Sequence, residues 1–109
     1  MTTFDEREKS FEKKFALDQE LKFRAKQRRN RLLGTWAAAK LAITGPGVDE
    51  YVKALRKADL TMKGDEDVFQ KVRKDFDAKG VAVSDAELRR AMADFLAQAV
   101  AQIEGERKG

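Results

Sequence analysis

The most informative part of the chain is residues 1–36, MTTFDEREKSFEKKFALDQELKFRAKQRRNRLLGTW. Good helix formers fill this segment, so we expect it to belong to one long helix. At about 100° per residue, three aromatic rings fall within roughly 20° of a common face: Phe4, Phe11 and Phe15. These three rings form an apolar face at the start of the predicted helix.

A second apolar stripe follows on the same helix, on a face rotated by roughly 70° from the first. Its members are Leu21, Ala25, Leu32 and Trp36. One core buries a stripe that stays in register, so the two stripes are not expected to serve the same core. We expect the second stripe to pack inside the domain and the phenylalanine face to meet another protein. The alternatives are that the phenylalanine face folds back on the chain's own helices, or that the three rings are scattered surface aromatics.

Basic charge is concentrated beside the second stripe. Residues 21–31, LKFRAKQRRNR, hold six basic side chains and no acidic one, whereas residues 1–20 hold four basic and six acidic. This stretch therefore accounts for the net charge of +4. Around the helix its basic residues divide into two rows that flank Leu21 and Ala25, where their stems can cover the edges of a buried seam.

The residue composition excludes several classes of function. The 109 residues include no cysteine and no histidine, which removes thiol chemistry, disulfides and the commonest acid–base and metal-binding side chain. We therefore expect no catalytic residue, no metal site and no enzymatic activity. No apolar run approaches the roughly 20 residues of a membrane span, and the charged N-terminus is unlike a targeting peptide. These features predict a single cytoplasmic domain.

Four helices with short connections are predicted. The first runs from Thr3, whose side chain forms a capping box with Glu6, to about Ile43, and the stretch TGPG at 44–47 ends it. The second is expected over 49–58, with Asp49 as its N-cap.

The third helix is expected over 66–79 and ends at Gly80. The fourth begins with a capping box of Ser84 and Glu87, its apolar face extends to Ile103, and the tail GERKG should fray. The sequence thus predicts an all-α four-helix bundle with a long first helix. Residues 1–18 form a flexible N-terminal extension of this helix, and residues 19–109 form the bundle.

Three consecutive acidic residues, Asp65, Glu66 and Asp67, precede the apolar residues of the third helix. They do not match the alternating ligand spacing of a calcium loop. We expect them to cap the helix and to complement its positive end.

Three segments of the chain resemble a known family. MTTFDEREKSFEKKF (1–15), RRNRLLGTWAA (28–38) and GDEDVF (64–69) are similar to the ζ subunit of the alphaproteobacterial F-type ATP synthase. This family consists of small, all-helical intrinsic inhibitors of the ATPase. The similarity is close over residues 1–38, whereas residues 45–62 are the least family-like part.

The resemblance implies a mechanism and a partner. In that family the N-terminal segment inserts as a helix at a catalytic interface of the synthase head and blocks rotation in the hydrolysis direction. The bundle docks on the outside of the head, so the protein is cytoplasmic and peripheral to the inner membrane. The resemblance assigns partner binding to the inhibitory segment, whose candidate contacts are Phe4, Arg7, Phe11, Lys13, Lys14 and Phe15.

A further expectation concerns the basic stretch. The resemblance implies weak binding of ATP or ADP by the bundle, with no resident cofactor, and the candidate phosphate contacts are Lys26, Arg28, Arg29 and Arg31. The sequence lacks a P-loop, because Gly45-Pro46-Gly47 has no following Gly-Lys-Ser/Thr. A different class of function remains open, in which residues 21–31 bind nucleic acid through their clustered positive charge.

Overall fold

A computed structural model describes residues 19–108 of the chain, with side chains up to Glu106. This part of the chain forms helices and contains no strand. The helices are α2 (Gln19–Lys40), α3 (Pro46–Asp59), α4 (Gly64–Lys79) and α5 (Asp85–Lys108). The all-α four-helix prediction is confirmed. Across the described range no helix is long and apolar enough to cross a membrane.

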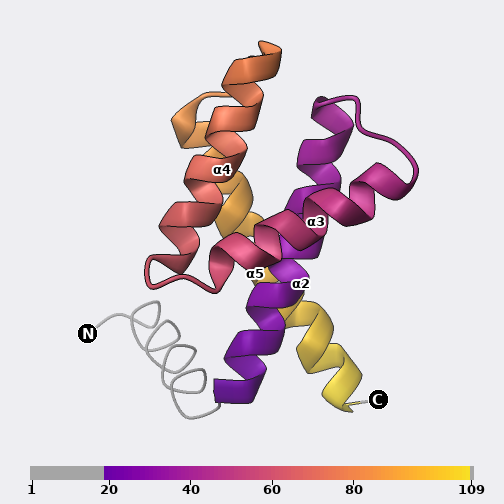
Figure 1. Ribbon diagram of the computed structural model, residues 1–109. Coiled ribbons are helices and arrows are strands. Elements are labelled where there is room, and N and C mark those ends of the chain that lie inside the picture. The colour runs from indigo at the N-terminus through magenta and orange to yellow at the C-terminus, as the bar shows by residue number, and fades with distance from the viewer. Residues whose placement is uncertain (1–18, 109) are drawn as a thin grey trace.

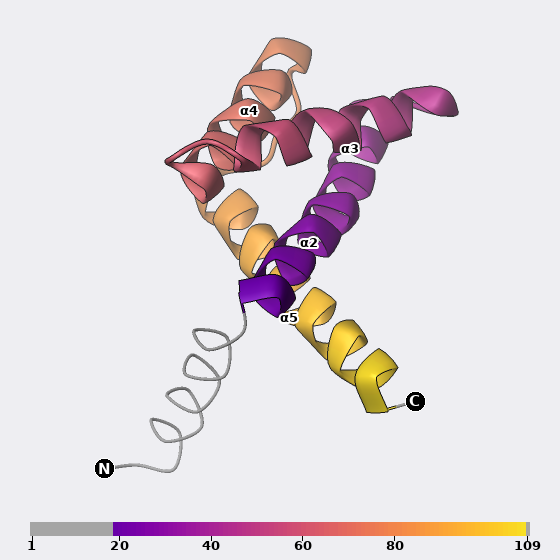
Figure 2. The same ribbon diagram turned by 60° about the horizontal axis from the view of Figure 1, so that its bottom comes forward.

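The helices form two regions that share α2 and α5 (Figure 1). In the body, α3 lies across α2, and α4 packs beside α3 and the first half of α5. In the arm, the first turns of α2 and the last turns of α5 extend away from α3 and α4, as both views show (Figure 1, Figure 2). Each region has its own apolar cluster.

The body encloses the main core. Its largest fully buried side chains are Leu33, Leu55, Phe76 and Leu88. Each such side chain contributes about 1.5–3 kcal/mol when it leaves water, so this core carries most of the stability. Trp36 lies at the edge of the core, half-buried, with its ring edge-to-face against Phe76 at a centroid distance of 5.8 Å.

The arm is held by a smaller cluster. Leu21 and Ala25 of α2 pack against Val100 and Ile103 of α5, and the half-buried Leu96 lies against them. The apolar face predicted for the fourth helix is therefore confirmed, and it serves both clusters. The helix continues beyond Ile103 to Lys108, so it extends past the end of its apolar face. The fraying expected for the tail GERKG stays a prediction.

The buried stripe of α2 differs from the predicted one beyond Ala25. Leu33 is fully buried, whereas the predicted Leu32 is half-buried. The cause is the crossing of α3 at Gly34, where an added Cβ would lie 2.8 Å from Val52 Cγ2 and 3.2 Å from Val52 Cα. Only glycine permits this approach, and it brings α3 over the face that carries Leu33.

Two helices end in the same hydrogen-bond pattern. At the end of α4, Gly80 has φ 68°, and the N–H of Val81 donates to the carbonyl oxygen of Phe76. At the end of α2, Ala42 has φ 61°, and the N–H of Ile43 donates to the carbonyl oxygen of Ala38. Both are Schellman motifs, and glycine suits the left-handed position better than alanine. The stop predicted at Gly80 is confirmed.

The start of α3 corrects a prediction. The helix begins at Pro46, with Gly45 as its N-cap, and Asp49 lies inside its first turn. Proline is favoured at the first helical position because its missing N–H would have no intrahelical partner there. Asp49 is therefore not the N-cap.

The other two helix starts gave different outcomes. At α5 the capping box is confirmed, because the N–H of Glu87 donates to Ser84 Oγ at 3.1 Å. At α4 the N-cap is Lys63, with no side-chain capping bond, so the expectation that the acidic residues cap this helix is wrong. Asp65, Glu66 and Asp67 lie in the first turn instead, where their charges still favour the positive helix end.

Candidate functional site

The residues assigned to the inhibitory segment lie outside the residues that the structure describes. They are Phe4, Arg7, Phe11, Lys13, Lys14 and Phe15, together with the capping box of Thr3 and Glu6. Their roles stay predictions. The structure does describe the basic stretch of α2, and it separates the side chains of this stretch into two sides.

The inner side of α2 centres on Arg29, whose side chain is 2% exposed. Its Nη2 lies 2.9 Å from Asp65 Oδ1 at the start of α4 and 3.5 Å from Asp59 Oδ1 at the end of α3. Its Nε donates to Asn30 Oδ1 at 2.7 Å. We call Arg29, Asn30, Asp59 and Asp65, together with Lys26, the inner cluster.

Asn30 and Lys26 complete the inner cluster. Asn30 Nδ2 donates to Asp59 Oδ2 at 3.1 Å, and Lys26 Nζ lies 3.6 Å from Asp65 Oδ1. Burial acts to raise the pKa of Asp65, but the hydrogen bond and positive charge of Arg29, aided by Lys26, hold it below its usual range. The cluster therefore joins α2, α3 and α4 through ion pairs and hydrogen bonds. Sequence analysis had placed Arg29 at the edge of a buried seam and as a phosphate contact, not inside the protein.

The outer side of α2 faces the arm and the end of α3. Here Arg28 forms an ion pair with Glu106 of α5, with Nη2 3.1 Å from Oε1. The hydrogen bond from Arg28 lowers the pKa of Glu106. This ion pair joins α2 to the last turns of α5 and so helps to hold the two helices of the arm together.

A groove of about 280 Å³ runs along this outer side. Its lining comes from α2, α3 and α5: Phe23, Arg24, Gln27, Arg28, Arg31, Arg56 and Ile103. We call it the arginine groove. The basic residues of α2 supply only part of the lining of this groove. Arg56 of α3 adds a further guanidinium group to it.

Three guanidinium groups of the groove form no ion pair among residues 19–106, although the pKa of Glu106, lowered mainly by Arg28, is lowered further by the charge of Arg24. Arg24 and Arg31 are exposed, and Arg56 is half-buried with its Nε enclosed and without a hydrogen-bond acceptor. Phe23, beside them, is 54% exposed. The groove therefore offers unused hydrogen-bond donors, positive charge and an aromatic ring to solvent.

The four residues predicted to contact a nucleotide are divided between the two sides. Lys26 and Arg29 point to Asp65 in the inner cluster, whereas Arg28 and Arg31 line the arginine groove. The structure therefore does not bring them together as one phosphate site. The signal that could have revealed this division is the presence of acidic residues at 59 and 65, which sequence analysis did not pair with α2.

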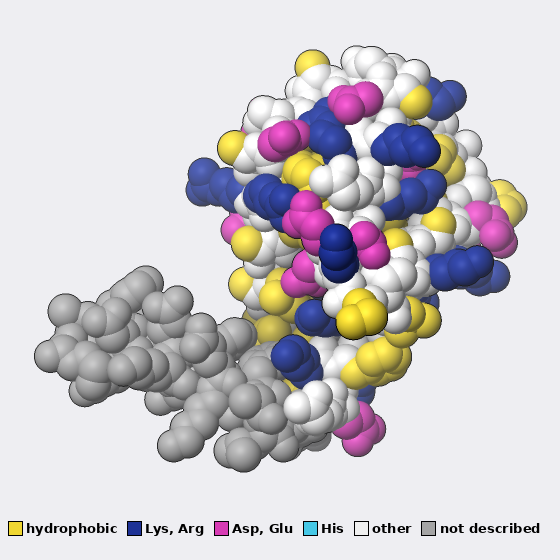
Figure 3. Space-filling view, turned by 60° about the vertical axis from the view of Figure 1, so that its left-hand side comes forward, with side chains coloured by type: hydrophobic (Ala, Val, Ile, Leu, Met, Phe, Trp, Pro, Cys, Tyr) yellow, Lys and Arg dark blue, Asp and Glu magenta, His cyan; other side chains and the backbone are white. Residues whose placement is uncertain are grey.

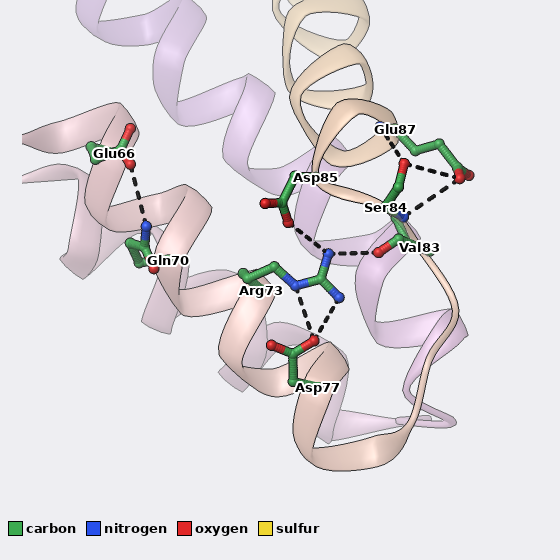
Figure 4. A network of polar contacts seen from close by, with 8 residues as sticks. All are labelled: Glu66, Gln70, Arg73, Asp77, Val83, Ser84, Asp85 and Glu87. Carbon is green, nitrogen blue, oxygen red and sulfur yellow. Dashed lines mark hydrogen bonds and ion pairs between the residues drawn. The ribbon is translucent and has the colours of Figure 1, made fainter.

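A second polar network, around Arg73 of α4, is structural (Figure 4). Arg73 Nη1 donates to the carbonyl oxygen of Val83 at 2.5 Å and lies 3.2 Å from Asp85 Oδ1, while Nη2 lies 2.8 Å from Asp77 Oδ1. One side chain thus ties α4 to the loop before α5. The network fixes the loop that precedes the capping box of α5.

The remaining charged surface is mixed. On the face drawn in Figure 3, basic side chains are interspersed with acidic ones. In the described range no group of acidic residues is arranged to hold a metal ion, and the acids at the start of α4 diverge. Glu66, for example, pairs with Arg89 of α5.

Comparison with known proteins gives one family. A family model described as ATPase inhibitor subunit zeta matches residues 1–102. The match covers the predicted inhibitory segment, the inner cluster and most of α5. No curated protein matches the chain.

Proposed function

The chain belongs to the ATPase inhibitor subunit zeta family, and from this premise we propose that it inhibits ATP hydrolysis by inserting residues 1–18 at a catalytic interface of an F-type ATP synthase. The inserted helix blocks rotation in the hydrolysis direction. Residues 19–109 form the bundle that carries this segment to the synthase. The role is regulatory, and the protein acts in the cytoplasm on the peripheral head of the synthase.

The observation that supports this mechanism most is the extent of the family match. It begins at residue 1 and continues through the bundle, so the segment that carries the phenylalanine face lies within the match, as the helices do. The described residues of the main core run from Leu33 to Met92, far along the chain from Phe4, Phe11 and Phe15. A helix with three aromatic anchors suits insertion into a groove between subunits.

Two other functions receive less support. Nucleic-acid binding needs many free positive charges, but Lys26, Arg28 and Arg29 are neutralised by acidic residues of the same chain. Adenine-nucleotide binding stays a prediction. A nucleotide phosphate at Lys26 or Arg29 would have to displace Asp65, so the groove side, with Arg28 and Arg31, is the part to test.

Deleting residues 1–18 tests the mechanism. The truncated chain should keep its melting temperature and lose inhibition of ATP hydrolysis by the purified catalytic head, because the bundle remains and the inserted helix is gone. Changing Phe11 and Phe15 to Ala in the full chain should weaken inhibition at least tenfold, since each buried ring contributes at least about 1 kcal/mol.

The same two variants expose a wrong assignment. Full inhibition by the truncated chain would place the inhibitory contact in the bundle. A large fall in melting temperature after truncation would show that the phenylalanine face is part of the chain's own core. The ATPase assay reports the first outcome, and thermal melts of both proteins, followed by far-ultraviolet circular dichroism, report the second.

A further inference from the structure

The arginine residues of the chain show a pattern that the inhibitory mechanism does not use. Among those whose side chains are described, Arg28, Arg29, Arg73, Arg89 and Arg90 each form an ion pair within the chain. The three that form none within residues 19–106 are Arg24, Arg31 and Arg56. All three line the arginine groove, although one of them comes from a different helix.

Such a concentration of unpaired guanidinium groups has a physical cost. Three like charges along one groove repel each other, and the enclosed Nε of Arg56 forgoes a hydrogen bond. Elsewhere the chain places an acidic side chain beside its arginines, as with Arg73 and Asp77. At the groove the acidic neighbour is Glu106, which pairs with Arg28, so one carboxylate faces four guanidinium groups and the positive charge is not balanced within the described residues.

From this we propose that the arginine groove is a docking site for an acidic segment of the ATP synthase, separate from the interface that receives residues 1–18. The inference rests on the proposed function, because it takes the synthase as the partner. Guanidinium groups bind carboxylates through paired, planar hydrogen bonds, which suits aspartate and glutamate side chains on a protein surface.

Phe23 indicates that the docking segment also has an apolar side chain. Its ring is more exposed than buried and lies in the same groove as Ile103, which belongs to the apolar cluster of the arm. An aromatic ring surrounded by arginines is a typical centre of a protein–protein contact, because it supplies area while the charges supply orientation. A nucleic acid would need a longer basic track than this groove provides.

The position of the groove along α2 strengthens the inference. Phe23 lies five residues after residue 18, which corresponds to about 8 Å along a helix axis. A docking contact here lies next to the inhibitory segment in the chain. Binding at the groove therefore raises the local concentration of that segment at the synthase.

The test compares two full-length variants that lose the same charge. The groove variant carries Arg24→Gln, Arg31→Gln and Arg56→Gln, and the control variant carries Lys63→Gln, Lys74→Gln and Lys79→Gln. The three lysines are exposed and form no ion pair among the described residues. Binding of each protein to the immobilised catalytic head of the synthase is measured by surface plasmon resonance at low and moderate salt.

We expect the groove variant to bind at least tenfold more weakly at low salt, mainly through slower association, and the control variant to change less than twofold. The difference should shrink at moderate salt because the groove is exposed. The single variant Phe23→Ala should dissociate several-fold faster. A double variant, Arg24→Gln with Arg31→Gln, leaves the half-buried Arg56 intact and guards against a folding defect, which thermal melting would reveal.

The outcomes separate the two proposals. If the wild-type chain inhibits the synthase and the groove and control variants bind alike, the docking site is wrong while the inhibitory mechanism stands. If the groove variant loses binding to ATP or to a DNA duplex but binds the head normally, the groove serves that ligand and the docking site is again wrong. If the wild-type chain does not bind the head at all, the proposed function itself fails.

Discussion

The inner and outer sides of α2 carry the same residue types in the same short stretch, yet they have opposite roles. On the inner side Arg29 is enclosed and pairs with Asp59 and Asp65. On the outer side Arg24 and Arg31 face solvent and form no ion pair in the described chain. The role of a basic residue therefore depends on which acidic residues the fold brings close to it. The inner side holds three helices together, and the outer side remains available for a partner.

Removing the positive charge of Arg29 should have the largest effect on the stability of the fold. Arg29→Met keeps most of the side-chain volume but leaves Asp59, 4% exposed at its side chain, without a compensating charge. We expect the free energy of unfolding to fall by about 3–5 kcal/mol, measured by urea denaturation. The matched outer variant, Arg31→Met, should change it by less than about 0.5 kcal/mol. Equal effects of the two changes would contradict the comparison.

Neutralising Asp59 should restore part of the stability that is lost in Arg29→Met. Adding Asp59→Asn to Arg29→Met removes the unpaired buried charge and keeps an acceptor for Asn30. The double variant should be about 1–3 kcal/mol more stable than Arg29→Met alone in the same urea experiment. If the second change adds to the damage, the cost of the first comes from packing rather than from charge.

The ion pairs of the inner side should also determine how the stability of the fold depends on acidic pH. The pKa of Asp65 in the folded chain lies below its unfolded value of about 3.9, so its ion pairs stabilise the fold above that pH. This stabilisation is lost as pH falls through the folded pKa. Thermal melts should show wild-type stability decreasing below about pH 4, with a shallower decrease for Arg29→Met. Parallel pH curves for the two proteins would exclude Asp65 as the cause.

The smallest effect is expected at the exposed ion pair of the outer side. Arg28→Gln removes the contact with Glu106 at the end of the arm. Because this pair is in contact with solvent, the loss of stability should be roughly a fifth or less of the Arg29→Met loss, and it should vanish at high salt. Urea denaturation at two salt concentrations measures it. A loss as large as that at Arg29 would show that the arm is essential to the body.

Much of the fold follows from local patterns. The stop at Gly80 and the capping box of Ser84 and Glu87 predicted the end of α4 and the start of α5, because these signals act within one or two turns. The start of α3 was misjudged because proline at a first helical position competes with a capping aspartate further along. Of the candidate site, the outer residues Arg28 and Arg31 were recognised, whereas Arg56 was not, since it lies on another helix.

The amino-acid sequence is sufficient to establish that this chain is helical, that it lacks histidine and cysteine chemistry, and that its excess of positive charge lies in residues 21–31. Composition and short-range periodicity carry that information. The tertiary structure, by contrast, sets which face of α2 is buried, because the close crossing at Gly34 places α3 over Leu33. It also decided that Arg29 is a structural residue and that the arginine groove is open. Arg29 pairs with Asp65, 36 positions away, and the groove joins α2 with Arg56 of α3. Sequence spacing alone does not say which distant side chains the packing of helices brings together.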